Sequence, residues 1–301
     1  MAILVTGSTG LVGSLLVEEL TGRGAEVRAA SRRGRAPEAM IDGVDAVFLH
    51  PRAVPDFGAL LAVARANGVR KVVALSALNV DDPDDEQPSR VVGDRNRECE
   101  QAAVASGLRW VSLRPSSFAS NTARAFGPQL QAGDVVRYPY AEFRESVLDE
   151  RDLAAVAAQA LLTDDLDGRR VELTGPHDLS HAAMVATIGS VLGRDLRFEE
   201  IPPAVVRVAM TRAGMPAGFV DGLLARYARH LDKPQHPATG NVAAILDRPA
   251  LTYAEWVAAH AAAFTQSVSA QSVSAQSVSA QSVSAQSVSA QSASARPEGN
   301  A

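Results

Sequence analysis

Residues 2–13 of the chain read Ala-Ile-Leu-Val-Thr-Gly-Ser-Thr-Gly-Leu-Val-Gly. Residues 2–7 are a short apolar run that ends in glycine, which is typical of a buried parallel strand. Leucines at helical spacing follow, from Leu11 to Leu20, and predict a helix that is stopped by Gly22 and Gly24. The N-terminus therefore predicts a strand, a glycine-rich turn and a helix in direct succession.

The turn between this strand and this helix has the composition of a phosphate-binding loop. Gly7 permits a tight turn, Gly10 lets the backbone approach a pyrophosphate, and Gly13 allows the helix to pack closely on the strand. The start of the helix adds free N–H groups and a partial positive charge. We therefore expect NAD(P) to contact the loop residues Thr6, Gly7, Ser8, Thr9, Gly10, Leu11, Val12 and Gly13. The alternative is a structural turn that holds no nucleotide.

The same alternation of strand and helix continues along the N-terminal part of the chain. Apolar runs predict further strands at residues 26–31, 45–49, 70–75 and 109–113, and helical patterns lie at 57–66 and 94–105. Strands that alternate with helices indicate a parallel α/β sheet. The fold class is therefore α/β, with a Rossmann-type doubly wound parallel sheet.

The link between the second and third predicted strands is unusually short. Thirteen residues separate Ser31 from Asp45, where the usual fold places a helix, another strand and a second helix. A right-handed crossover needs about a dozen residues, so this link has room for one crossover only. We predict that the outer strand 3 is absent and that the strand order is 2-1-4-5-6 in conventional numbering. Because the missing strand normally ends near the adenine, its absence puts adenine binding in question.

The C-terminal half predicts a smaller substrate lobe. Residues 116–144 look irregular, whereas helices are expected at 149–162, 182–192 with Ser180 as cap, 202–230 with breaks at Gly214 and Pro216, and 252–264. We divide the chain into a nucleotide-binding core at 1–118 and a substrate lobe at 119–264, from which 149–175, including a short strand at 170–173, return to the core. Residues 265–301 are a low-complexity tail with five repeats of Gln-Ser-Val-Ser-Ala, expected to be disordered.

Composition excludes some classes of binding partner and indicates a cellular location. The net charge of −5 and the pI near 5.7 argue against a general nucleic-acid or anionic-membrane binder. The single cysteine, Cys99, rules out an intrachain disulfide and a cysteine-cluster metal site. Neither a secretory signal nor an apolar span is recognisable, so a cytoplasmic location is expected. The oligomeric state is left open.

Several further segments identify a family resemblance. Residues 68–76 end in Ser76, residues 106–115 end in Leu113-Arg114-Pro115 and are followed by Phe118 and Asn121, and Asp152-Leu153-Ala154 begins a helix. Together with the spacing of the glycine loop, these segments resemble the NmrA-like branch of the atypical short-chain dehydrogenases/reductases, which includes NADPH:quinone reductases and redox-sensing regulators. The resemblance covers residues 2–264.

The resemblance implies two possible functions, and the missing strand adds a third possibility, a degenerate member that binds no nucleotide. The first is an NAD(P)H-dependent oxidoreductase that passes hydride from NADPH to a small conjugated acceptor such as a quinone. The second is a non-catalytic, redox-sensing NAD(P)-binding regulator that binds a protein partner. The resemblance places Leu49, Ser76, Pro115 and Ser116 at the cofactor, and Ser117, Phe118 and Asn121 in the substrate pocket. For Ser116 and Ser117, a role in a turn or cap is an equal alternative.

One departure from the superfamily concerns the catalytic residues. The usual pair is Tyr-x-x-x-Lys, in which lysine lowers the pKa of a tyrosine that acts as acid or base. None of the four tyrosines of this chain has a lysine four positions later, and the motif would fall on Val92 and Asn96. The catalytic residues are therefore unknown from sequence, and only an acceptor that needs little acid assistance is expected to react.

The second predicted strand ends in Ser31-Arg32-Arg33, without the acidic residue that binds the ribose of NAD. Two arginines suit the 2′-phosphate of NADP, so NADP(H) is expected to be preferred over NAD(H); a solvated basic loop is the alternative. His177 and His181 are interpreted as surface or capping residues, and no metal is expected. The acidic residues 81–86 are interpreted as a solvated loop.

Overall fold

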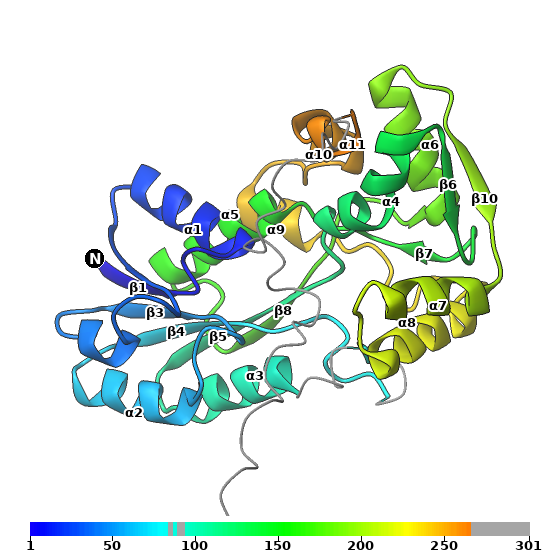
Figure 1. Ribbon diagram of the computed structural model, residues 1–301. Helices are drawn as coiled ribbons and strands as arrows, with labels where there is room; N and C mark the ends of the chain where they lie inside the picture. Colours follow the sequence, from blue (N-terminus) through cyan, green and yellow to red (C-terminus); the bar gives the residue numbers. More distant parts are fainter. Residues whose placement is uncertain (84–86, 89–93, 266–301) are drawn as a thin grey trace, which may run out of the picture.

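The computed structural model describes residues 1–83, 87–88 and 94–265. Six parallel strands form the central sheet in the order β2-β1-β3-β4-β5-β8 (Figure 1). The strands are β1 (Ala2–Thr6), β2 (Glu26–Ala30), β3 (Ala46–Leu49), β4 (Lys71–Leu75), β5 (Arg109–Pro115) and β8 (Arg169–Leu173). The predicted α/β class with a doubly wound parallel sheet is confirmed.

Helices cover both faces of this sheet, because its strands are apolar on both sides. The helices α1 (Leu11–Gly22), α5 (Glu150–Leu162) and α9 (Asn241–Leu246) pack on one face, and α2 (Phe57–Ala66) and α3 (Arg95–Ala105) on the other (Figure 1). Along β1, whose residues are all buried, successive side chains lie on opposite faces of the sheet. Ile3 and Val5 join the core under α1 and α5, whereas Leu4 joins the core over α2 and α3.

The short link between β2 and β3 carries no strand in the described segment 31–45, only the 3-10 turn η1 (Pro37–Met40). β3 therefore pairs directly with β1, in register Ile3 with Ala46. Asp45 reinforces this pairing, because its carboxylate accepts from the Ala2 N–H and its own N–H donates to the Ala2 carbonyl, each at 2.8 Å. The predicted strand order without outer strand 3 is confirmed, and β8 extends the sheet beyond β5.

A second hydrophobic core lies to one side of the sheet and is built from residues between Ala119 and Phe264. Figure 1 shows its elements grouped beyond the end of β5. They are α4 (Ser120–Ala132), β6 (Val135–Tyr138), β7 (Arg144–Glu145), β9 (Leu179–Ser180), α6 (His181–Leu192), β10 (Arg197–Glu200), α7 (Pro203–Arg212), α8 (Ala217–Arg229), α10 (Tyr253–Ala259) and α11 (Ala262–Thr265).

Two sequence predictions in this region are wrong. Residues 116–144 are regular for much of their length: α4 buries Phe126 and Leu130 in the second core despite Pro128, and β6 pairs in parallel with β10. Such pairing between distant strands leaves no local signal. The helix expected at 252–264 is two short helices, since α10 ends at Ala259, before His260.

Other predictions for this region are confirmed. Ser180 caps α6, with its hydroxyl accepting from the Ala183 N–H at 3.1 Å, and the break between α7 and α8 falls at residues 213–216. The low-complexity tail after Thr265, and Val92, lie outside the described residues. None of the described helices has the length and apolar character needed to cross a membrane.

Candidate functional site

The three glycines of the loop after β1 differ in how much space the surrounding structure leaves for a side chain. Gly7 has φ +72°, and a Cβ there would lie 3.0 Å from Cγ of His50. A Cβ at Gly13 would lie 2.1 Å from the Gly7 carbonyl oxygen, so α1 can approach the loop only without a side chain there. Gly10 has an ordinary φ of −85°, and its Cβ would meet only that oxygen, at 3.3 Å. The fold therefore requires glycine at Gly7 and Gly13. The absence of a side chain at Gly10 instead leaves open space above the loop.

The start of α1 is open to an anion. Gly10 occupies the N-cap position without a side-chain cap, and the first turn of the helix has no acidic residue. Thr9 is exposed, and Leu11 exposes 40% of its surface although it is apolar. Uncapped N–H groups at a helix start attract a phosphate. This part of the loop therefore fits the pyrophosphate of a dinucleotide.

Other residues assigned to the cofactor from sequence are part of the scaffold. The Thr6 hydroxyl donates to the Phe48 carbonyl at 2.9 Å and accepts from the His50 N–H at 2.8 Å. The Ser8 hydroxyl donates to the Ala30 carbonyl at 3.0 Å. The side chains of Val12 and Leu49 are buried in the cores on the two faces of the sheet. These four side chains hold the loop in place and have little surface left for a ligand.

Positive charge gathers where β2 and β3 end. Ser31 is half-buried, and Arg32 and Arg33 are exposed. Arg52, which sequence analysis missed, lies in the turn after β3 and is partly buried; burial and the Arg32 charge both lower its pKa. No described residue accepts a hydrogen bond from the Arg52 guanidinium. Arg52 could have been recognised from the sequence as a basic residue just after the carboxyl end of a predicted strand.

His50 lies in the same cluster, and the positive charges of its arginines affect the pKa of this histidine. Burial, followed by the charges of Arg52 and Arg32, lowers the pKa of His50 to about 4. The imidazole is therefore neutral at physiological pH, and its Nδ1 accepts from the Arg52 backbone N–H at 3.1 Å. The cluster consequently has an excess of positive charge from its arginines, which fits a phosphate group.

The residues predicted beside the nicotinamide lie at the ends of β4 and β5. Ser76 is buried, and its hydroxyl has no hydrogen-bond partner in the described part of the chain. Pro115 ends β5, and the Ser116 hydroxyl donates to the Ser146 carbonyl at 2.5 Å. An unpaired buried hydroxyl is rare in folded proteins. The Ser76 hydroxyl is therefore available for a hydrogen bond to a bound molecule.

A cavity of about 310 Å³ opens beside the end of β5. Of the residues predicted there, Pro115, Ser116, Ser117 and Asn121 line it, and the Asn121 amide donates to the Ser117 hydroxyl at 3.2 Å. Phe118 does not line it and is buried where it bridges to Leu148. Sequence analysis missed most of the lining, which includes Phe126, Tyr138, Glu145, Met184, Met210, Met215, Phe219, Leu223, Arg226, Tyr227 and His236.

The cavity contains no tyrosine–lysine pair among its lining residues. Asn96, at the family position of the lysine, lines the cavity with a neutral amide. Tyr138 and Tyr227 also line it, but burial raises the pKa of Tyr138 to about 12 and also raises the pKa of Tyr227 well above its ordinary value. Both phenols are therefore poor acids, as expected without a neighbouring lysine.

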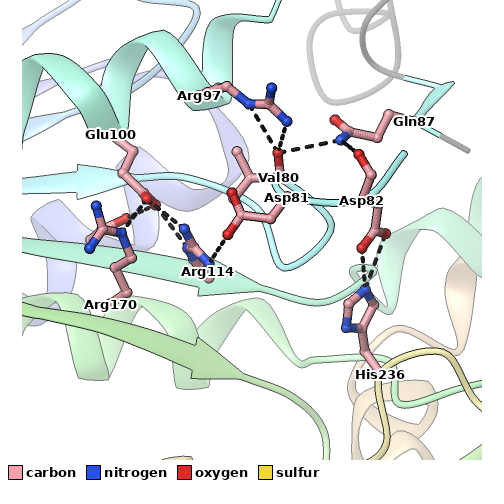
Figure 2. Close-up of polar contacts among 10 residues, drawn as sticks. Val80, Asp81, Asp82, Gln87, Arg97, Glu100, Arg114, Arg170 and His236 are labelled. Carbon is pink, nitrogen blue, oxygen red and sulfur yellow. Dashed lines mark hydrogen bonds and ion pairs between the residues drawn. The ribbon is translucent and has the colours of Figure 1, made fainter. Parts of the chain in front are cut away.

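The acidic segment after β4 is exposed at Asp81, as the sequence predicted, but both of its described aspartates are paired (Figure 2). Asp81 is largely exposed but pairs with Arg114 at 2.7 Å, and the side chain of Asp82, 10% exposed, binds Nε2 of His236 through both carboxylate oxygens at 3.1 Å. Arg114 in turn is held by the buried Glu100. The sequence could not show this pairing, because Arg114 lies in β5 and His236 lies 154 positions from Asp82. Residues 84–86 lie outside the described part.

His181 is also placed differently from its prediction as a surface or capping residue. It is 2% exposed, and its Nδ1 lies 3.1 Å from the Pro139 carbonyl and 3.0 Å from the Tyr140 carbonyl. Burial lowers the pKa of this histidine. His177 is exposed as expected. No group of three potential metal ligands occurs among the described residues.

Comparisons with known proteins decide the family. A family model described as NAD(P)H-binding matches residues 35–164. The (4-alkanoyl-5-oxo-2,5-dihydrofuran-3-yl)methyl phosphate reductase of Streptomyces griseus is 35% identical over 283 residues, which cover 87% of this chain and 99% of that protein. This chain belongs to the NmrA-like, NAD(P)H-binding family of atypical short-chain dehydrogenases/reductases. The family predicted from the sequence motifs is thereby confirmed.

Other members and neighbours agree with this assignment. The NAD(P)H azoreductase of Xenophilus azovorans is 31% identical over 289 residues, covering 87% of this chain and 99% of that protein. The fold matches the Escherichia coli NADPH-dependent quinone oxidoreductase complexed with NADPH, with a TM-score of 0.70 at 20% identity over 86% of this chain and 99% of that one. The Citrobacter sp. triphenylmethane reductase gives 0.69 at 14% identity, with the same coverage. This chain is an NAD(P)H-dependent oxidoreductase.

Proposed function

We propose that this chain reduces a small conjugated acceptor such as a quinone, with NADPH preferred over NADH. The cavity beside the end of β5 carries the proposal, because in open α/β sheets ligands bind outside the carboxyl ends of the strands. Its volume of about 310 Å³ and its aromatic and methionine lining suit one small, flat molecule. NADPH, when bound, supplies the hydride.

The cofactor would lie along the carboxyl ends of the first strands. The loop from Thr6 to Gly13 would hold the pyrophosphate on the uncapped start of α1. Ser31, Arg32 and Arg52 would surround the 2′-phosphate, with the exposed Arg33 at the edge. The preference for NADPH rests on the Arg52 guanidinium, since the described part of the chain offers it no acidic partner.

The acceptor would bind between the two hydrophobic regions of the chain. Ser76, Pro115 and Ser116 would border the nicotinamide, and Ser117 and Asn121 would contact the acceptor. Phe118 would support this edge from the core. In this proposal residues 1–118 and 149–175 bind the cofactor, and the remainder of 119–264 closes the acceptor side.

The two relatives support a conjugated acceptor. By their names, one reduces an alkanoyl-substituted oxo-dihydrofuran and the other an azo compound. Both groups, like a quinone, are electron-poor π systems that accept a hydride readily. Ordinary ketones are expected to react more slowly, because an isolated carbonyl is a weaker hydride acceptor than a conjugated system and the described lining offers no tyrosine–lysine pair.

Filling the cavity tests the proposal. Leu223→Trp adds a large side chain to the lining, and we expect the KM for a quinone to rise at least tenfold while the Kd for NADPH is unchanged. The matched control is Leu231→Trp, at a 36% exposed leucine outside the lining. An unchanged KM in Leu223→Trp would place the acceptor elsewhere.

A further inference from the structure

We propose that His236 is the proton donor to the acceptor and that Asp82 is the residue that positions it. The proposal rests on the proposed reduction of a conjugated acceptor by NADPH and widens it. With a proton donor in the cavity, the chain can reduce acceptors that need a proton during the reaction, such as azo compounds and conjugated carbon–carbon double bonds.

The segment that carries Asp82 is fixed to the core of the sheet. The Val80 carbonyl accepts from Arg97 Nε at 3.1 Å and from the Gln87 amide at 3.3 Å. Asp81 pairs with Arg114, which forms two hydrogen bonds to Glu100, at 2.9 and 2.6 Å (Figure 2). Buried charged networks of this kind restrict movement. The Asp82 carboxylate therefore has a well-defined position at the edge of the cavity.

The segment that carries His236 is fixed independently, at the end of β8. The Thr239 N–H donates to the Thr174 hydroxyl at 2.7 Å, and the Ala238 N–H donates to the Asp178 carboxylate at 2.9 Å. Asp178 also accepts from the Ser146 hydroxyl. Both anchor points lie near the serines at the end of β5, since Ser116 binds the Ser146 carbonyl. The imidazole is thus held on the acceptor side of the site.

The ring itself has one committed and one available nitrogen. Nε2 lies 3.1 Å from both Asp82 oxygens, and Figure 2 shows the other nitrogen directed away from this carboxylate. Nδ1 has no hydrogen-bond partner among the described residues, although the ring lines the cavity. A carboxylate that fixes one imidazole nitrogen and leaves the other for chemistry is a recurring arrangement for proton transfer.

The other ionisable groups that line the cavity are less suited to this task. Tyr138 and Tyr227 have pKa values raised by burial, so they release a proton poorly. Nδ1 of His181 is occupied by two backbone carbonyls, and burial lowers its pKa. Glu145 and Arg226 face each other at 3.5 Å, and Arg226 also binds Gln235.

The step balances with His236 as the only proton source. The acceptor gains two electrons as a hydride at one atom of its double bond, and NADPH becomes NADP⁺. The Nδ1–H bond of the imidazolium breaks, and that proton adds to the other atom, nitrogen in an azo compound or carbon in a conjugated alkene. Neutral His236 keeps its Nε2–H on Asp82 and recovers a proton from water. A quinone needs this proton less, because the hydroquinone anion is stable.

Paired acceptors test the role of His236. At saturating NADPH, His236→Gln should lower kcat for an azo dye about 10²-fold or more and kcat for a p-quinone less than about threefold. Glutamine keeps an N–H for Asp82 but does not act as an acid. Asp82→Asn should lower azo turnover about tenfold, since the ring remains but its orientation is weakened. His177→Gln, at an exposed histidine outside the cavity lining, is the control and should change neither rate.

A readout without cofactor separates chemistry from folding. In protein with ¹⁵N-labelled histidines, six in this chain, the ring-nitrogen signal of His236 is assigned as the one lost in His236→Gln. Added hydroquinone should shift that signal and leave the His177 signal in place. Equal losses of azo and quinone turnover in His236→Gln, full azo turnover, or an unshifted signal would each overturn the role of His236. A wild type that reduces neither acceptor would overturn the proposed function with it.

Discussion

The glycine loop after β1 and the cavity beside β5 are built in opposite ways. The loop is one continuous run, residues 6–13, and its open part is formed by backbone at Gly10 and at the uncapped start of α1. The cavity gathers side chains from Ala77 to His236, and its polar edge depends on a contact between positions 154 residues apart. A site made by backbone can be predicted from a short motif, whereas a site made by side chains from distant segments requires the fold.

The largest expected effect is a loss of stability on substitution of Gly13, whose role in packing the loop differs from the role of Gly10. Gly13→Val places a side chain against the Gly7 backbone, where its Cβ would lie 2.1 Å from the carbonyl oxygen. Because backbone cannot move aside easily, we expect a loss of at least about 3 kcal/mol in the free energy of unfolding, and little folded protein. Chemical denaturation followed by circular dichroism measures it.

Gly10→Val and Gly22→Ala complete this comparison. Gly10 has an ordinary φ, and its Cβ would be 3.3 Å from the nearest atom, so Gly10→Val should fold and lose NADPH binding. An alanine at Gly22 meets nothing within 4 Å and should change neither property. A folded Gly10→Val that binds NADPH as the wild type does would mean that this loop is not a phosphate site.

The next effect concerns the charged network that supports the cavity. Glu100 is buried and accepts hydrogen bonds from Arg114, Arg170 and Ser112. Glu100→Gln should lower the free energy of unfolding by about 2–3 kcal/mol, at the low end for a buried ion pair because Arg170 is partly exposed. Urea denaturation at neutral pH measures this loss, and a change below experimental error would show that the network contributes nothing to stability.

The pH dependence of the stability of this variant shows whether the ionised form of Glu100 stabilises the fold. Burial raises the pKa of Glu100, but hydrogen bonds from Arg114, Ser112 and Arg170 outweigh it and lower the pKa from 4.5 to about 2. A lowered pKa adds stability that is complete above the unfolded value and is lost on acidification. The stability difference between wild type and Glu100→Gln should therefore be constant above about pH 5 and shrink from pH 4.5 towards pH 2. A difference that grew on acidification would contradict this assignment.

The smallest of these effects concerns the choice of cofactor. Replacing Arg32 and Arg52 by alanine should remove about 1–3 kcal/mol of NADPH binding, roughly ten- to hundredfold in Kd, and leave NADH binding unchanged. Isothermal titration with both nucleotides measures it. Arg35→Ala, on the same link and exposed, controls for general charge. Equal weakening of both nucleotides would show that the arginines do not bind the 2′-phosphate.

Much of the fold could be predicted because its signals are local. Apolar runs marked the sheet strands, and the short link between Ser31 and Asp45 predicted that strand 3 is missing. The prediction failed for β6 and β10, whose parallel pairing joins Val135 with Arg197. It also failed for α4, where Pro128 obscured a helix stabilised by burial of Phe126 and Leu130.

The candidate site divides in the same way. The sequence predicted as site residues the glycine loop, the basic end of β2 and the serines after β5, all of which adjoin strand ends. It missed Arg52 and His236, because neither belongs to a motif. Each can be recognised only from a residue that lies beside it in the fold, Arg32 in the case of Arg52 and Asp82 in the case of His236. It also missed the pairing of Asp81 with Arg114 and of Asp82 with His236, because both partners lie far along the chain.

We expect this chain to carry out hydride transfer and not only to bind the nucleotide. The most direct measurement is an anaerobic single turnover, in which protein loaded with stoichiometric NADPH is mixed with a p-quinone and the NADPH absorbance is followed. We predict complete loss of that absorbance with one hydroquinone formed per NADPH, and slower loss in Leu223→Trp. Tight NADPH binding without oxidation by a panel of quinones would contradict the account and indicate a redox-sensing regulator.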